Sequence, residues 1–182
     1  SRCGLMTRDT VEALARAGCE EVWMGAESGS QNVLDAMDKD MRVEEIGAAR
    51  ENLRRHGIRA CYFLQFGYPG ETWREIQATV EMVRATRPDD VGVSVSYPLP
   101  GTEFHTRVAR QIGHKQNWSH SDDLAMMFEG AYATPFYRAL RDAVHAEVET
   151  LNGRPPAMDL AAAWRRVEEL ERSCASLTPT VL

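Results

Sequence analysis

Three short apolar runs recur along the chain at intervals of roughly 35 residues, the length of a strand, a helix and the loops that join them. The runs are Glu21–Ala26, Ile58–Phe66 and Asp90–Tyr97. A helical pattern separates each run from the next, and strands connected in this way pair in parallel. Their apolar residues occupy successive positions, which is typical of strands covered on both faces by helices or by a barrel interior. The sequence therefore predicts an α/β fold with a parallel sheet, either doubly wound or part of a barrel.

Capping signals predict where the helices between the runs begin and end. Thr7 is a suitable N-cap for a helix that stops at Gly18, and Ser30 is a suitable cap for a short turn. Apolar residues at helical spacing predict a second helix over Val43–His56. Thr72–Glu75 reads as a capping box, and we expect the helix that it starts to stop near Pro88.

The last third of the chain has a different character. Gly113–Asp123 is polar and irregular, and no strand pattern returns after it. Thr134 followed by proline predicts a helix start, and the apolar stripe that follows stops at Asn152. A final amphipathic helix is predicted over Met158–Cys174. We therefore predict two parts: a parallel α/β part over residues 1–105 and a mostly helical extension over residues 106–182.

Composition narrows the class of protein. The chain has 182 residues, of which 43% are hydrophobic and 26% charged, as in a soluble globular protein. The net charge of −6 comes without a cluster of Lys and Arg, which argues against a nucleic-acid partner. No apolar run approaches the roughly 20 residues needed to cross a bilayer, so we expect no membrane partner and a cytoplasmic location.

Polar loops broken by glycine follow the first two predicted strands, at Gly25–Ser30 and Phe66–Thr72. The third predicted strand ends in a proline-rich loop, Pro98–Thr102. In a parallel sheet the carboxyl ends of the strands share one edge, and the loops that leave this edge converge on a ligand. The sequence therefore predicts a binding rim for a small polar cofactor.

The three loops also carry a resemblance. Read in order, the segments GAESGSQ, FGYPGET and YPLPGTEFH resemble the fourth, fifth and sixth strand regions of the radical S-adenosylmethionine enzymes. The resemblance covers Ser1 to His105 and implies a fragment of a partial (β/α)6 TIM-like barrel. It is closest to the branch that carries a cobalamin-binding domain, which includes the anaerobic magnesium-protoporphyrin ester cyclase type. Asn117–Ser119 and Phe136–Leu140 resemble the segment that follows the barrel in that branch.

The resemblance implies radical chemistry on S-adenosylmethionine, and it implies a cluster-binding loop that this chain does not contain. Enzymes of this superfamily use a [4Fe–4S] cluster on a CxxxCxxC loop to cleave S-adenosylmethionine reductively to a 5′-deoxyadenosyl radical. The four cysteines of this chain, at positions 3, 19, 61 and 174, do not form this motif. We therefore interpret the chain as the carboxyl-terminal part of a longer enzyme that performs methyl transfer or ring formation and is inactive without its upstream part. The expected partners are that upstream part, with the cluster and a cobalamin domain, and a small-molecule substrate that the sequence does not identify.

The resemblance also assigns cofactor-binding residues. Glu27 and Ser28 would bind the ribose or the methionyl end of the cofactor, although the residues alone leave open a solvated or helix-capping carboxylate at Glu27. Glycine at 67 and 70 would let the backbone approach the adenine, although a tight turn alone could require it. Glu71 is predicted to stabilise a helix N-terminus. The full set is Glu27, Ser28, Gly29, Phe66, Gly67, Tyr68, Pro69, Gly70, Pro98 and Gly101, with no metal ligand and no catalytic residue assigned.

Two other functions remain open from the sequence. The first is a non-catalytic binding or assembly module that uses a half-barrel as a partner surface. The second is a different α/β enzyme that binds phosphate at these loops, which is disfavoured because neither a GxGxxG nor a GxxxxGK pattern is present.

Overall fold

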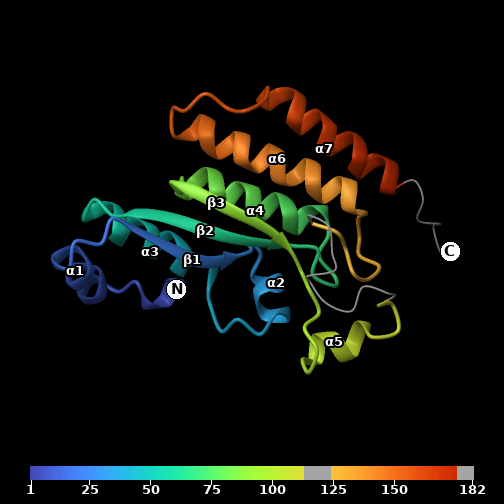
Figure 1. Ribbon diagram of the computed structural model, residues 1–182, viewed down its shortest axis with the longest axis horizontal. Helices are drawn as coiled ribbons and strands as arrows, with labels where there is room; N and C mark the ends of the chain where they lie inside the picture. Colours follow the sequence, from blue (N-terminus) through green and yellow to red (C-terminus); the bar gives the residue numbers. More distant parts are fainter. Residues whose placement is uncertain (113–123, 176–182) are drawn as a thin grey trace.

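The computed structural model describes residues 1–112 and 124–175, and its centre is a parallel sheet of three strands (Figure 1). The strand order β1-β2-β3 follows the sequence. The strands are β1 (Glu21–Glu27), β2 (Arg59–Phe66) and β3 (Asp90–Val95). In register, Glu27 lies beside Leu64, and Phe66 lies beside Val95. The predicted parallel α/β fold is therefore confirmed, and all three strands end at the same edge of the sheet.

The helices around the sheet largely follow the local signals. Thr7 caps the first helix by accepting a hydrogen bond from the Thr10 amide at 3.3 Å, and Gly18 ends the segment at φ +77°. Ser30 occupies the predicted N-cap position, but its side chain caps no amide there. The elements of this part are η1 (Cys3–Leu5), α1 (Arg8–Arg16), α2 (Gln31–Ala36), α3 (Val43–Arg55) and α4 (Trp73–Thr86).

Three helices follow the last strand: α5 (Glu103–Val108), α6 (Thr134–Leu151) and α7 (Leu160–Ala175). The helical character predicted for this part of the chain is confirmed. The sequence did not predict α5, and the predicted boundary at residue 105 falls inside it, so the division into two domains stays a prediction. Thr134 is not the N-cap of α6, because Ala133 holds that position. The Thr134 hydroxyl instead accepts a hydrogen bond from the Met126 amide at 3.1 Å.

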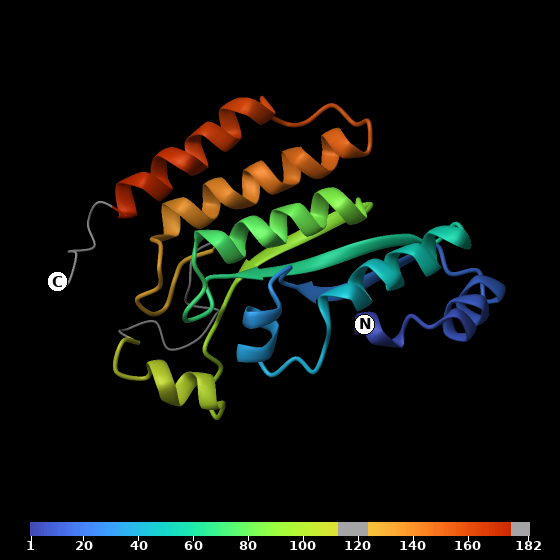
Figure 2. The same cartoon turned by 180° about the vertical axis from the view of Figure 1, so that it is seen from behind.

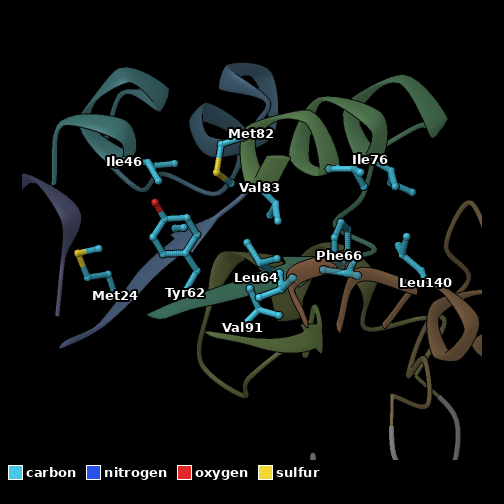
Figure 3. Packing of buried hydrophobic residues seen from close by; sticks show 14 of the residues in the cluster. Met24, Ile46, Tyr62, Leu64, Phe66, Ile76, Met82, Val83, Val91 and Leu140 are labelled. Atoms are coloured by element: carbon cyan, nitrogen blue, oxygen red, sulfur yellow. The ribbon is translucent and has the colours of Figure 1, made fainter. Parts of the chain in front are cut away.

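One continuous core joins the sheet to the helices. Alternate residues of β2 point to one side, where Ala60, Tyr62, Leu64 and Phe66 are buried. Figure 3 shows Tyr62 and Leu64 directed toward side chains of the helical layer, including Ile46, Met82 and Val83. Helix α6 packs against both α4 and β3, and α7 packs against α6. The buried face of the sheet therefore fixes where each strand ends and where its loop begins.

The other face of the sheet is open, in contrast to the predicted cover on both faces. Figure 1 shows the strands in front of α3 and α4, and Figure 2 shows these helices in front of the strands. On the open face Phe63 of the central strand is 49% exposed and stacks on Trp23 with ring centroids 4.9 Å apart. Within residues 1–112 and 124–175, no helix is long and apolar enough to span a bilayer.

Candidate functional site

The loop after β1 presents the carboxylate of Glu27 at the carboxyl edge of the sheet. Glu27 adopts φ +60°, which side chains other than glycine seldom adopt, and the strand register shifts between Gly25 and Glu27. The Glu27 side chain folds back over Gly25, where an added Cβ would lie 2.7 Å from Oε1. The same oxygen accepts a hydrogen bond from Lys39 Nζ at 3.0 Å. The Glu27 side chain is 16% exposed, so the carboxylate remains reachable from solvent.

Ser28 and Gly29 face inward from this loop. The Ser28 hydroxyl is fully buried and lies 3.1 Å from Thr79 Oγ1 of α4, and the Gly29 amide donates to the same Thr79 oxygen at 2.9 Å. A Cβ at Gly29 would come within 2.4 Å of the Ala78 carbonyl oxygen. The structure thus gives both residues a role in docking the loop on α4, and their cofactor role stays a prediction.

The loop after β2 is held by hydrogen bonds at both of its sides. Gly67, at φ +76°, donates its amide to Glu71 Oε2 at 2.6 Å. The Tyr68 hydroxyl donates to the Ala36 carbonyl at 2.7 Å, which ties the loop to the end of α2. Phe66, one of the predicted cofactor-binding residues, instead points into the core and is 1% exposed. Pro69 is half-buried, and Gly70, at φ +90°, is exposed with open space around its α-carbon.

Glu71 is a site residue that the sequence analysis misjudged. Its carboxyl group is 2% exposed and binds the Gly67 amide, so it stabilises the loop and not the start of α4. Burial raises the pKa of Glu71 to about 8, against the lowering effect of the Gly67 hydrogen bond. Within the described residues, Glu71 Oε1 and the Tyr137 hydroxyl are both buried without a hydrogen-bond partner. The Tyr137 hydroxyl also lies against Gly67, 3.1 Å from where its Cβ would be.

The loop after β3 leads directly into α5. Pro98 is buried, and Gly101, at φ +88°, is exposed. Thr102 then caps α5 by accepting a hydrogen bond from the His105 amide at 3.1 Å. The turn at Gly101 therefore has a conformational reason for glycine, and the predicted cofactor role of Gly101 stays a prediction.

Two neighbouring pockets open at this edge, and Lys39 lines both. The first has a volume of about 250 Å³ and holds Glu27 and Arg2 in its wall. The second, of about 340 Å³, lies between the ends of β2 and β3 and helix α5. Its wall includes Gln65, Tyr68, Tyr97, Leu99, Phe104 and Arg107. Of the ten predicted residues, Glu27 lines the first pocket and Tyr68 the second, while Ser28, Gly29 and Phe66 pack inward.

The cysteines do not fit an iron–sulfur cluster. The described residues include no group of three or more His, Cys, Asp or Glu side chains that could hold a metal ion. Cys3 is buried with its thiol 3.5 Å from the Gly25 carbonyl oxygen, and Cys61 is buried in β2. Burial raises the pKa of both thiols to about 12, which disfavours the thiolate that metal binding requires. The segment around Asn117–Ser119 lies outside the described residues.

A parallel βα sheet whose loops form pockets at the carboxyl edge is the architecture of many cofactor-binding α/β enzymes. Residues 1–83 match the sequence profile of the radical SAM superfamily. This match and the relatives below confirm the resemblance to the radical S-adenosylmethionine enzymes that the three loops indicated.

Curated relatives support the same conclusion. The chain is 28% identical over 126 residues to bacteriochlorophyllide d C-12(1)-methyltransferase of Chlorobaculum tepidum, which covers 69% of this chain and 27% of that protein. It is 31% identical over 113 residues to tRNA-2-methylthio-N(6)-dimethylallyladenosine synthase of Corynebacterium jeikeium, covering 58% of this chain and 22% of that one. The chain thus spans about a quarter of the length of the curated relatives that it matches.

A solved structure shares the fold. Elp3 of Methanocaldococcus infernus, with residues 1–46 deleted, superposes with a TM-score of 0.56 at 17% sequence identity. The superposition covers 83% of this chain and 30% of the Elp3 chain. This likeness confirms the predicted partial-barrel fold class.

Proposed function

We propose that this chain forms the S-adenosylmethionine-binding rim of a radical SAM enzyme. The observation that carries the proposal is the position of Glu27 in the wall of a pocket, at the edge where the Gly67 loop also begins, in a chain whose residues 1–83 match the superfamily. Two of the relatives are named as methyltransferases, which favours methyl transfer over ring formation.

Each wall of the rim suits a part of this cofactor. The Glu27 carboxylate would accept hydrogen bonds from ribose hydroxyls or lie beside the positive methionyl end. Its partial burial strengthens such bonds, because the local dielectric constant is below that of water. Gly70 has open space where a side chain would be, so a flat ring would meet no Cβ there, and Tyr68 lines the second pocket.

The [4Fe–4S] cluster and the cobalamin would have to be bound outside this chain. S-adenosylmethionine supplies a 5′-deoxyadenosyl radical or a methyl group in enzymes of this kind. Because the four thiols of this chain do not fit a [4Fe–4S] cluster, we propose that an upstream part of the same polypeptide holds the cluster and a cobalamin, and that the chain alone is inactive. The role of this chain is then to bind and orient the nucleoside and to shield it from water.

Binding of S-adenosylmethionine to the purified chain tests the proposal. In equilibrium dialysis we expect saturable binding with a Kd on the order of 1 mM, because only part of the site is present. Glu27→Gln should weaken binding by about tenfold, as loss of a charged hydrogen bond does. The control is Glu20→Gln, an exposed carboxylate at the opposite end of β1, which should bind like the unchanged chain.

The outcomes separate clearly. Absence of saturable binding, or equal affinity for S-adenosylmethionine in the Glu27→Gln chain and the unchanged chain, would contradict the proposal. ATP serves as a second ligand, and a preference for ATP would favour the phosphate-binding alternative.

A further inference from the structure

The orientation of the Glu27 carboxylate depends on a neighbour that the sequence analysis did not single out. The backbone at φ +60° turns the side chain away from the regular strand direction, and the missing side chain of Gly25 provides the space that it fills. A left-handed backbone is unfavourable for a residue other than glycine, so we expect a partner to hold the Glu27 carboxylate in that position. Lys39 Nζ, 3.0 Å from Oε1, is that partner.

The backbone of the loop that carries Lys39 is restrained on both sides of this residue. Lys39 stands between Asp38 at φ +54° and Asp40 at φ +45°, so two left-handed residues fix its backbone. Its amide donates to the Leu34 carbonyl at 3.1 Å, and its carbonyl accepts a hydrogen bond from the Arg2 guanidinium at 3.3 Å. These hydrogen bonds hold the Lys39 backbone in place, so the side chain that binds Glu27 extends from an ordered position.

The ion pair leaves one carboxylate oxygen for a ligand. Lys39 binds Glu27 through Oε1, and no described residue donates a hydrogen bond to Oε2. The Lys39 side chain is 36% exposed and stands at the wall between the two pockets. The pair is thus accessible from the first pocket, where a ligand would meet an oriented acceptor.

We propose that Lys39 is a positioning residue that orients the Glu27 carboxylate for cofactor binding. The inference rests on the proposed function, because it assigns Lys39 a role through the residue expected to bind S-adenosylmethionine. Lys39 itself does not have to touch the cofactor. Its contribution is to hold Oε1, so that Oε2 is left for the ligand and the side chain loses less conformational freedom on binding.

A double-mutant cycle on S-adenosylmethionine binding tests this. Lys39→Met keeps the length of the side chain and removes its charge, and we expect it to weaken binding by about tenfold in the unchanged background. In the Glu27→Gln background the same substitution should change the affinity by a factor of no more than about two, because the residue it positions is already lost. Lys39→Arg should restore most of the affinity.

Two controls exclude a general structural effect. Arg59→Met breaks the 2.8 Å Arg59–Glu21 ion pair at the amino end of the same sheet and should leave binding unchanged. The thermal unfolding midpoint of each variant shows whether it is folded, and a merely structural role for Lys39 would lower this midpoint in both Glu27 backgrounds alike.

The inference and the proposed function fail in different ways. If Glu27→Gln leaves binding intact, the proposed function fails. If Glu27→Gln weakens binding but Lys39→Met does not, or if Lys39→Met acts equally in both backgrounds, the positioning role alone is overturned.

Discussion

Glu71 is buried, and burial disfavours the ionised form of its carboxyl group. Its side chain is buried under the loop after β2, with one oxygen bound to the Gly67 amide and the other unpaired within the described residues. Burial therefore raises the pKa of Glu71 to about 8, from an ordinary value of 4.5. The group is protonated at neutral pH in the folded chain and ionised in the unfolded chain, so the two states differ in bound protons.

This difference predicts how stability depends on pH. Below pH 4.5 both states hold the proton, and between pH 4.5 and 8 the unfolded state loses it first, so the free energy of unfolding falls by up to about 1.4 kcal/mol per pH unit. Glu71→Gln removes that loss, because an uncharged amide replaces the acid. Urea unfolding at pH 5 and pH 8 should show a smaller fall for this variant than for the unchanged chain. Glu81→Gln, an exposed change on α4, is the control, and equal falls in all three chains would contradict the prediction.

At the scale of elements, one carboxylate joins three helices. Glu147 of α6 accepts two hydrogen bonds from the Arg84 guanidinium of α4, at 3.0 and 2.9 Å, and one from Trp164 Nε1 of α7, at 2.7 Å. The Arg84 guanidinium also lies 5.3 Å from the centre of the Trp164 ring. Burial acts to raise the pKa of Glu147, but the hydrogen bonds from Arg84 and Trp164 outweigh it and lower the pKa. The helical extension is thus attached to the sheet part by polar contacts as well as by apolar packing.

Removing the Glu147 carboxylate should lower the free energy of unfolding more than removing a surface ion pair does. Glu147→Ala leaves the Trp164 N–H without its acceptor, and we expect a loss of about 1–3 kcal/mol in the free energy of unfolding. Glu168→Ala, which removes an exposed pair with Arg172 at 3.8 Å, should cost less than about 1 kcal/mol. Urea titrations followed by tryptophan fluorescence give both values. Equal losses for the two variants would show that the Glu147 contacts stabilise the fold no more than an exposed ion pair does.

Local signals in the sequence specified most of these elements, and distant contacts set the rest. The stop at Gly57 and the bond from the Thr72 amide to Glu75 at 3.0 Å depend on residues close in the chain, and both were predicted. Helix α5 has too few residues to show a helical period, so it was missed. The inward roles of Ser28 and Gly29 depend on Thr79, some 50 residues further along the chain. No local pattern marks such a contact, and the burial of Glu71 arises in the same way.

At the scale of the whole molecule, the open face of the sheet stands out. Parallel sheets are normally covered on both sides, yet Phe63 in the middle of the central strand is 49% exposed. The exposed Phe63 ring, stacked on the half-buried Trp23 of the edge strand β1, favours association between chains. This surface also suits the assembly module that the sequence left open as an alternative.

Substitution of Phe63 tests this property. Phe63→Thr keeps a residue that favours strands while removing the exposed ring, and we expect it to lower the average mass measured by light scattering at a given concentration. Met158→Thr, which removes a side chain that is 40% exposed in the connection between α6 and α7, should leave the average mass unchanged. A monomeric unchanged chain, or an equal effect of both substitutions, would contradict the prediction.

The close approach of Gly29 to Ala78 connects the loop after β1 to helix α4, which begins after the loop that follows β2. Since a Cβ at position 29 would lie 2.4 Å from the Ala78 carbonyl, the first loop of the rim rests directly on the helix that begins after the second. Inserting one residue into α4 ahead of Ala78 would rotate that carbonyl by about 100° and remove the support. The two loops should therefore be exchanged between related barrels only as a pair, together with the first two turns of α4.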